Sequence, residues 1–323
     1  EEIIMTYKIL IADKLGKPGL ERLDGMADVA YDVRTGLTKE ELIAVIPAYD
    51  AVIIRSDTRL DADVLAAATR LKVIGRAGIG VDNVDVEAAT AHGILVMNTP
   101  HANSVATAEQ TMALILAAHR HTVKAHNSLA AGQWVRADFV GAELYCKTLG
   151  IIGFGYIGRL VAQRAQAFGM NVVAYDPYVS MDAAAQLDVS LLSLPELLAK
   201  SDVITLHAVS TAETKGIINA QTIAGMKDGV VIVNVARGKL IDEEALADAL
   251  RSGKVATAAV DVYQEEPPTH SPLIGLPNVL HTPHLGASTQ EAQRRVGVEI
   301  VEQVADALRG VAYRNVLNPL PAL

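Results

Sequence analysis

Residues Thr148 to Asp176 read TLGIIGFGYIGRLVAQRAQAFGMNVVAYD, and they carry the strongest structural signal in this chain. An apolar run leads into the hexapeptide GFGYIG at 153–158, a helical pattern follows, and a second apolar run ends on Asp176. Strand, glycine turn, helix, strand and terminal acid together make up the context of a dinucleotide-binding βαβ unit. The pattern therefore predicts a Rossmann-type parallel sheet in this half of the chain.

Each glycine of this loop has an expected task. Gly153 permits the tight turn, Gly155 lets the backbone approach a pyrophosphate, and Gly158 lets the helix lie close to the strand. The pyrophosphate would rest on the free N–H groups at the helix N-terminus. Asp176 would accept hydrogen bonds from the adenosine ribose hydroxyls and repel a 2′-phosphate, which favours NAD over NADP. The alternative is a glycine-rich turn in an α/β protein that binds no nucleotide.

The bulk properties limit the class of protein. A length of 323 residues suits two domains, and a chain that is half hydrophobic but 4 % aromatic suits buried parallel strands. The net charge of −9 argues against a nucleic-acid partner. Cys146 is the only cysteine, which fits a reducing cytoplasm. The longest apolar run, Met112 to Ala118, is too short for a membrane span, and the acidic N-terminus, in which Met5 is a candidate start, is unlike a signal peptide.

Short apolar runs alternate with helical stretches on both sides of the glycine loop. This rhythm predicts a first α/β unit over residues 1 to about 100 and about six parallel strands in the nucleotide half. A capping box at 288–291 predicts the start of a helix of about five turns ending near Gly310. A long helix on each side of the nucleotide half suggests that the chain leaves the first domain and returns to it. We expect two Rossmann-like or flavodoxin-like domains with parallel sheets: residues 102–289, and a discontinuous domain of 1–101 and 290–323.

Candidate catalytic residues follow three strands of the nucleotide half, where ligands bind in such sheets. Hydride transfer from an alcohol needs a base, and His284 is the natural candidate because histidine is the side chain suited to proton transfer near neutral pH. Glu266 is the best candidate to orient that imidazole, and Arg237 is suited to grip a carboxylate bidentately. Taken singly, each has an ordinary alternative: a surface ion pair for the arginine, a solvated loop for the glutamate, and a backbone partner for the histidine.

These residues lie within a set of motifs that resembles the D-isomer-specific 2-hydroxyacid dehydrogenases over nearly the whole chain, from Ile9 to the C-terminal tail. The motifs are GRAGIGVDNVD (Gly75–Asp85), NTPHANS (Asn98–Ser104), TLGIIGFGYIG, VNVARGKLIDEEAL (Val233–Leu246), AVDVYQEEPP (Ala259–Pro268) and HTPHLGAST (His281–Thr289). In that family the arginine, glutamate and histidine of three of these motifs form the catalytic set. The resemblance places them on Arg237, Glu266 and His284.

The resemblance implies further site residues, with NAD as the cofactor and no metal. Besides the three glycines and Asp176, it implies that the NAD site includes Tyr156, Ile157, His207, Ala208, Val235, Ala236, Asp261, Gly286 and Ala287. It implies that the domain made of both chain ends binds substrate through Arg55, Ser56, Arg76, Ala77, Gly78 and Asn103 and closes on the nucleotide domain by a hinge motion. One departure is that Val209 stands where the family usually has proline, two residues after His207.

Within the family, the motifs are most similar to the members that oxidise D-3-phosphoglycerate with NAD, the entry step to serine. Arg55 and Arg76 would bind the substrate phosphate. The alternatives are a reductase of glyoxylate or hydroxypyruvate, a D-lactate dehydrogenase and, in another class, an NAD-sensing co-repressor-like protein. A formate dehydrogenase is less favoured, since glutamine is expected there at position 266. We expect a homodimer or homotetramer, with the helix after Asn103 and the Trp134 loop at the interface. From the chain length we expect that the serine-binding regulatory domain of longer members is missing. We therefore expect no feedback inhibition by serine.

Overall fold

The computed structural model of the chain describes residues 6–319, so Met5 and the last residues of the predicted C-terminal tail lie outside the described residues. The chain divides into two compact units. The first contains Glu1–Asn103 and Thr289–Leu323, and the second is the continuous segment Ser104–Ser288.

The first unit is built on a five-stranded sheet in which all strands are parallel. Its order, β2-β1-β3-β4-β5, is that of flavodoxin-like folds. The strands are β1 (Tyr7–Ile11), β2 (Val29–Val33), β3 (Ala51–Ile54), β4 (Val73–Arg76) and β5 (Leu95–Asn98).

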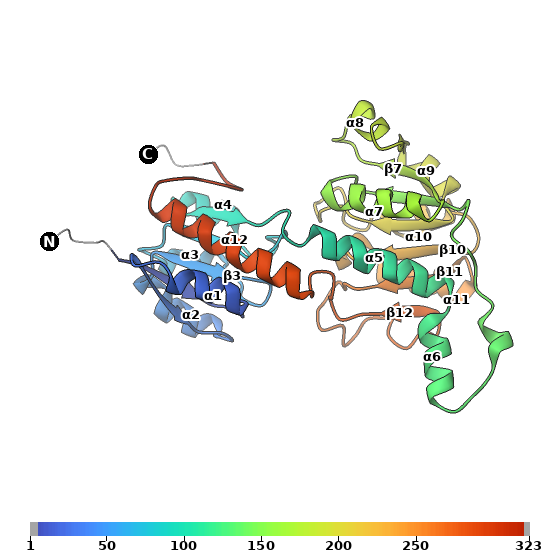
Figure 1. Cartoon of the computed structure of the whole chain (residues 1–323), viewed down its shortest axis with the longest axis horizontal. Helices are drawn as coiled ribbons and strands as arrows, with labels where there is room; N and C mark the ends of the chain where they lie inside the picture. Colours follow the sequence, from blue (N-terminus) through green and yellow to red (C-terminus); the bar gives the residue numbers. More distant parts are fainter. Residues whose placement is uncertain (1–5, 320–323) are drawn as a thin grey trace. The chain divides into compact units, whose positions relative to one another are not determined.

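Helices cover both faces of this sheet (Figure 1). α1 (Lys17–Asp24) and α12 (Gln290–Leu308) share one apolar core with the sheet. α2 (Lys39–Val45), α3 (Ala62–Ala67) and α4 (Val86–Ala91) share the core on the other face. α12 lies directly on β4, because a Cβ built on Gly75 would be 2.5 Å from the Val304 side chain.

The second unit contains a seven-stranded parallel sheet with the order β12-β11-β10-β9-β6-β7-β8. Its strands are β6 (Thr148–Ile152), β7 (Asn171–Tyr175), β8 (Ser190–Leu191), β9 (Val203–Leu206), β10 (Val230–Asn234), β11 (Val255–Val260) and β12 (Val279–His281). The sequence predicted about six strands. The additional one, β8, has two residues and is too short to give a periodic signal.

This sheet too is covered on both faces, so the fold is doubly wound, as predicted. α5 (Ser104–His119), α7 (Tyr156–Ala167) and α8 (Met181–Ala185) contribute to one core. α9 (Leu194–Lys200), α10 (Ala220–Ala224) and α11 (Glu243–Ser252) contribute to the other. α6 (Thr122–Ala130) buries no residue, and the Trp134 side chain that follows it is 79 % exposed.

The start of α12 differs from the prediction. Thr289, not Ser288, is the N-cap residue, and its side chain accepts a hydrogen bond from the Ala292 amide. Ser288 instead donates its backbone amide to the Leu285 carbonyl, which closes the preceding turn. The predicted capping box with Glu291 is therefore wrong by one residue. Among the described residues, no helix is long and apolar enough to cross a membrane.

Candidate active site

The glycine loop between β6 and α7 has the geometry of a nucleotide cradle. Gly153 adopts a φ of 93°, and a Cβ there would lie 2.5 Å from the Ala208 nitrogen. A Cβ on Gly158 would collide with the Gly153 carbonyl oxygen. A Cβ on Gly155, the residue before α7, would meet nothing within 4 Å. Two glycines are therefore needed for packing, while the third borders open space at a helix N-terminus, where a pyrophosphate fits.

Asp176 lies at the end of β7, next to this loop. Its Oδ2 accepts a hydrogen bond from the Phe154 amide at 2.8 Å, and its Oδ1 accepts one from the Tyr178 amide at 2.9 Å. Each carboxylate oxygen has two lone pairs, so both retain capacity for a ribose hydroxyl. The same carboxylate thus braces the glycine loop and presents a negative charge beside it.

Glu266 and His284 form the acid–base pair of the site. Glu266 Oε2 lies 2.7 Å from His284 Nδ1, and Glu266 Oε1 accepts the Tyr263 amide at 3.1 Å. Burial raises the pKa of Glu266, but the hydrogen bond and charge of His284, the Tyr263 amide and the charge of Arg237 together lower that pKa below its usual value. An ionised carboxylate only accepts hydrogen bonds, so Nδ1 carries the proton. His284 Nε2 is left as the nitrogen that can exchange a proton with a substrate.

The loop that carries His284 is organised by Asp261, which is completely buried at the end of β11. Its carboxylate accepts the Leu285 amide at 2.7 Å and the Gly286 amide at 2.8 Å, and its backbone oxygen accepts the His284 amide. His284 itself adopts a φ of 54°. These bonds define the backbone from which the imidazole projects.

Arg237 follows β10 in a loop that packs on the Glu266 loop. A Cβ on Gly238 would collide with the Tyr263 backbone, so only glycine permits this approach. The Arg237 carbonyl accepts the Asn234 side-chain amide at 2.9 Å, and its Nη1 donates to the Ala236 carbonyl at 2.7 Å. The charge of Arg237 lowers the pKa of Glu266, as noted above. The structure therefore brings all three predicted catalytic residues to one edge of one sheet.

Glu243 is a residue of this region that the sequence did not single out. It is 8 % exposed at the first turn of α11, where it accepts the Gln264 amide at 2.8 Å and the Ser271 hydroxyl. It thus ties α11 to the loop that carries Glu266. Acids are common in the first turn of a helix, so its sequence position looks ordinary. Only its burial and its distant partners distinguish it.

His207 lies under the glycine loop, where its carbonyl carbon is 2.6 Å from a Cβ built on Gly153. Its Nε2 lies 3.0 Å from the Thr205 hydroxyl, and burial lowers the pKa of His207 to about 3. The imidazole is therefore neutral, and it is the His207 backbone that lies against the glycine turn. Among the other residues expected at the NAD site, Val235 is buried, whereas Tyr156, at the first turn of α7, is 55 % exposed.

In the first unit, two of the predicted substrate residues end neighbouring strands. Arg55 follows β3, and its backbone is fixed by the buried Asp13 carboxylate, which accepts the Arg55 amide, and by Asn83, which donates to the Arg55 carbonyl at 2.7 Å. Arg76 ends β4, and its guanidinium crosses Gly78 so closely that a Cβ there would collide with Nη1.

The remaining substrate candidates lie in the same unit. Ala77 is 3 % exposed, Asn103 is 9 % exposed and the Ser56 hydroxyl donates to Asp57 at 3.1 Å. Across residues 6–319, no group of three or more His, Cys, Asp or Glu side chains lies where it could hold a metal ion.

A nucleotide cradle with an acid at the end of the second strand, on a sheet whose carboxyl edge also carries an acid–base pair and an arginine, is typical of NAD-dependent dehydrogenases. Residues 112–286 match the family model described as "D-isomer specific 2-hydroxyacid dehydrogenase, NAD binding domain". The chain belongs to the D-isomer-specific 2-hydroxyacid dehydrogenase family, and its second unit carries that NAD-binding domain. The predicted family, fold class and cofactor are thereby confirmed.

Several known proteins are similar to nearly the whole chain. The chain is 50 % identical to a D-3-phosphoglycerate dehydrogenase of Methanocaldococcus jannaschii over 96 % of its own length and 59 % of that protein. It is 47 % identical to one of Archaeoglobus fulgidus, over 98 % and 60 %. The solved TT0316 protein of Thermus thermophilus superposes with a TM-score of 0.89 at 37 % identity, covering 96 % of this chain and 100 % of that one. The chain thus spans about three fifths of the curated relatives it matches.

Proposed function

We propose that the protein oxidises D-3-phosphoglycerate to 3-phosphohydroxypyruvate with NAD⁺. The observation that carries this proposal is the 2.7 Å contact of Glu266 with His284, close enough to Arg237 for its charge to act on the glutamate. The relatives named D-3-phosphoglycerate dehydrogenase, at 47–50 % identity, support the choice of substrate.

The chemistry follows from the tautomer of His284. Bound NAD⁺ supplies the acceptor for the hydride that leaves C2 of the substrate. His284 Nε2 takes the proton of the C2 hydroxyl, and the Glu266 carboxylate stabilises the imidazolium that forms. Product formation thus transfers one hydride and one proton. In the reverse direction, His284 returns the proton to the carbonyl oxygen.

Arg237 binds the substrate carboxylate in this proposal, because a guanidinium matches a carboxylate with two parallel hydrogen bonds. Residues 1–101 and 290–323 act as the substrate domain. There, Arg55 and Arg76 bind the phosphate, supported by Ser56, Ala77, Gly78 and Asn103. The two arginines end adjacent parallel strands, which supports their acting on one anionic group.

In the nucleotide domain, residues 102–289, the NAD contacts are proposed to come from the glycine loop, the first turn of α7, Asp176 and the segments after β9, β10, β11 and β12. Besides the three glycines and Asp176, the contributing positions are Tyr156, Ile157, His207, Ala208, Val235, Ala236, Asp261, Gly286 and Ala287. The free space at Gly155 supports this assignment.

The deciding experiment supplies the purified protein with NAD⁺ and one of three acids: D-3-phosphoglycerate, D-glycerate or D-lactate. We expect NADH formation to be fastest, by kcat/KM, with D-3-phosphoglycerate. Faster turnover of an unphosphorylated acid would point to the glyoxylate or hydroxypyruvate reductase or D-lactate dehydrogenase alternatives. Tight NAD binding without turnover of any of the three acids would refute the proposed enzymatic activity. It would favour the alternative of an NAD-sensing protein.

We also propose a homo-oligomer working in the cytoplasm. α6 and the segment after it present several exposed apolar side chains, of which Trp134 and Val140 are each 79 % exposed. Apolar patches of this kind mark protein interfaces. The single cysteine supports a reducing compartment. Sedimentation of the wild type and of Trp134→Glu tests the interface, because a buried charge should dissociate the oligomer.

A further inference from the structure

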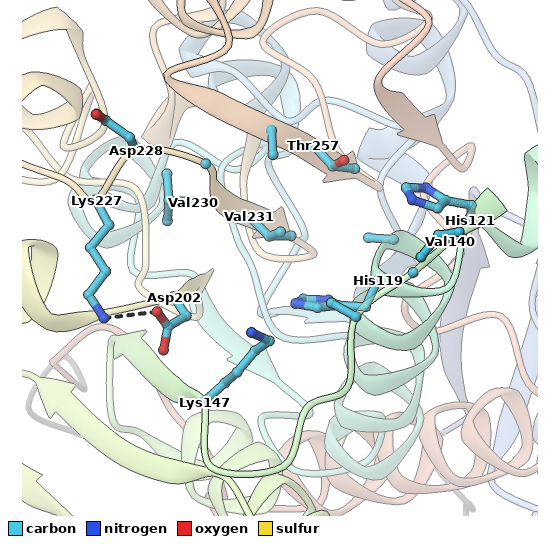
Figure 2. A pocket seen from close by; sticks show the side chains of 15 residues that line it. His119, His121, Val140, Lys147, Asp202, Lys227, Asp228, Val230, Val231 and Thr257 are labelled. Carbon is cyan, nitrogen blue, oxygen red and sulfur yellow. Dashed lines mark hydrogen bonds and ion pairs between the residues drawn. The ribbon is translucent and has the colours of Figure 1, made fainter. Parts of the chain in front are cut away.

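A polar cavity, shown in Figure 2, lies in the nucleotide unit away from the residues assigned to NAD, substrate and catalysis; it includes Val140, which the proposed oligomer interface also contains. Its volume is about 390 Å³. Lys147 and Asp202 line it immediately before β6 and β9, and Gly229 lines it immediately before β10. It therefore lies at the amino ends of the parallel strands, whereas Arg237, Glu266 and His284 follow carboxyl ends. A ligand here would not occupy the dinucleotide site.

The lining holds two lysines and two aspartates, and each aspartate already has a lysine partner. Asp202 forms an ion pair with Lys227 at 2.8 Å and accepts the Thr148 amide at 2.8 Å. Asp228 forms an ion pair at 2.8 Å with Lys254, which lies outside the lining. Within the part of the chain that the structure describes, Lys147 forms no ion pair of its own. An anion is the ligand that the Lys147 ammonium favours.

His119, at the end of α5, adds a hydrogen-bond acceptor to the cavity, so the ligand must also supply a donor. The His119 side chain is buried, and its Nδ1 lies 2.9 Å from the Ile115 carbonyl oxygen, which can only accept, so Nδ1 is the donor. Burial lowers the pKa of His119, and together with the charges of Lys147 and His121 it outweighs the hydrogen bond to Ile115 and the charge of Asp202, which raise that pKa. The ring is therefore neutral at pH 7 and its Nε2 is an acceptor. Figure 2 shows the ring and the Lys147 ammonium both pointing into the cavity.

We propose that this cavity binds a small oxyanion that keeps one acidic proton at neutral pH, the chemistry of hydrogen phosphate. The oxyanion accepts hydrogen bonds from Lys147 Nζ, and its hydroxyl donates one to His119 Nε2. Sulfate has the same shape but carries no proton at pH 7, so it would face the His119 lone pair without a donor. A site that requires a donor rejects an analogue without one. The cavity has room for phosphate and several ordered waters.

The test compares inorganic phosphate with sulfate at pH 7 by isothermal titration calorimetry. Saturating NADH is present throughout, so that the dinucleotide site is occupied. We expect phosphate to bind at least about tenfold more tightly than sulfate, which is the value of one charge-assisted hydrogen bond. Lys147→Met should weaken phosphate binding by about tenfold or more. Lys215→Met, which removes an exposed lysine elsewhere in the same unit, should change it by less than about twofold.

A second measurement locates the phosphate independently of Lys147. Histidine ring ¹⁵N spectra of the wild type should show phosphate moving one imidazole signal, and His119→Gln should remove that signal. Equal affinity for phosphate and sulfate, unchanged affinity in Lys147→Met, or an unmoved His119 signal would each overturn the proposal. So would a Lys147→Met protein that loses its oligomeric state but binds phosphate normally, because the cavity would then belong to a subunit interface.

Discussion

The carboxyl edges of the two parallel sheets carry different chemistry. The edge of the seven-stranded sheet gathers the ionised Glu266, the imidazole of His284 and Arg237 around a glycine cradle. The corresponding edge of the five-stranded sheet holds Arg55 and Arg76 after adjacent strands. The first edge contains a proton acceptor and an NAD-binding loop. The second offers guanidinium groups, whose charge does not change at any pH at which proteins fold.

Buried carboxylates brace both edges, but the loops that they hold carry different groups. In the seven-stranded sheet, buried carboxylates hold loops that carry titrating groups: Asp261 holds the His284 loop and Glu243 holds the Glu266 loop. In the five-stranded sheet, Asp13 holds the loop of a permanent cation, Arg55. In the proposed function, a similar arrangement of the backbone therefore supports proton transfer in one sheet and anion binding in the other. Substitutions at the first edge should alter kcat, and those at the second should alter KM.

The largest effect is expected from His284→Asn. Loss of the proton acceptor should lower kcat by about a thousandfold, while the NADH dissociation constant stays within about twofold, because the cradle is untouched. Steady-state rates and NADH fluorescence titration measure the two quantities. His270→Asn, at an exposed position nearby, is the matched control. If His284→Asn keeps its activity, His284 is not the base, and the proposed contrast between the two edges is wrong.

Asp176→Ala should have the next largest effect, confined to cofactor choice. Without the carboxylate, the repulsion of a 2′-phosphate and the bonds to the ribose are lost. The ratio of kcat/KM for NAD to that for NADP should fall by about ten- to a hundredfold. Because the carboxylate also accepts the Phe154 amide, Asp176→Asn is the control that keeps an acceptor oxygen there. An unchanged ratio in both variants would mean that another residue selects NAD.

Arg55→Met tests the second edge. The KM for D-3-phosphoglycerate should rise by about tenfold with a smaller change in kcat, because one charge-assisted contact to the phosphate is lost. The KM for an unphosphorylated 2-hydroxy acid should not change. Arg59→Met removes an exposed arginine of the same loop and is the control. If both variants behave alike, Arg55 contributes only general positive charge.

The smallest effect concerns stability and His207. Its folded pKa of about 3 lies below the ordinary value of 6.5, so the unfolded chain binds the proton more readily. The free energy of unfolding should therefore fall as the pH drops from 6.5 toward 3, by at most about 1.4 kcal/mol per pH unit from this group. Urea unfolding of His207→Gln should show a shallower decline than the wild type, whereas the exposed His126→Gln should not. Equal slopes would mean that His207 titrates normally.

The sequence was most informative where structure is local. The strand, glycine turn and helix at 148–167 follow from residues that are neighbours in the chain, and so does the helix that begins at Ser104. The grouping of Glu266 with His284 was also accessible, because both follow strands of one parallel sheet.

Long-range contacts account for what was missed. The partner of Glu243, Ser271, is 28 positions away, and Asp13 reaches Thr58 across 45 positions. No periodicity encodes such a pair. The cap of α12 was misplaced because Ser288 and Thr289 are chemically equivalent caps, and the turn at Leu285 decides between them. β8 was missed because an edge strand of two residues has no pattern to read.

The placement of α12 has a consequence for the order in which the protein can fold during synthesis. α12 covers one face of the five-stranded sheet, yet it is made only after the entire seven-stranded unit has been translated. The continuous segment 104–288 can therefore reach its native topology first, since domains generally fold as units. Meanwhile β3 and β4 are left with a bare apolar surface, including the Gly75 backbone that later receives Val304. On the ribosome, that surface is the natural point of engagement for a chaperone that binds exposed apolar segments.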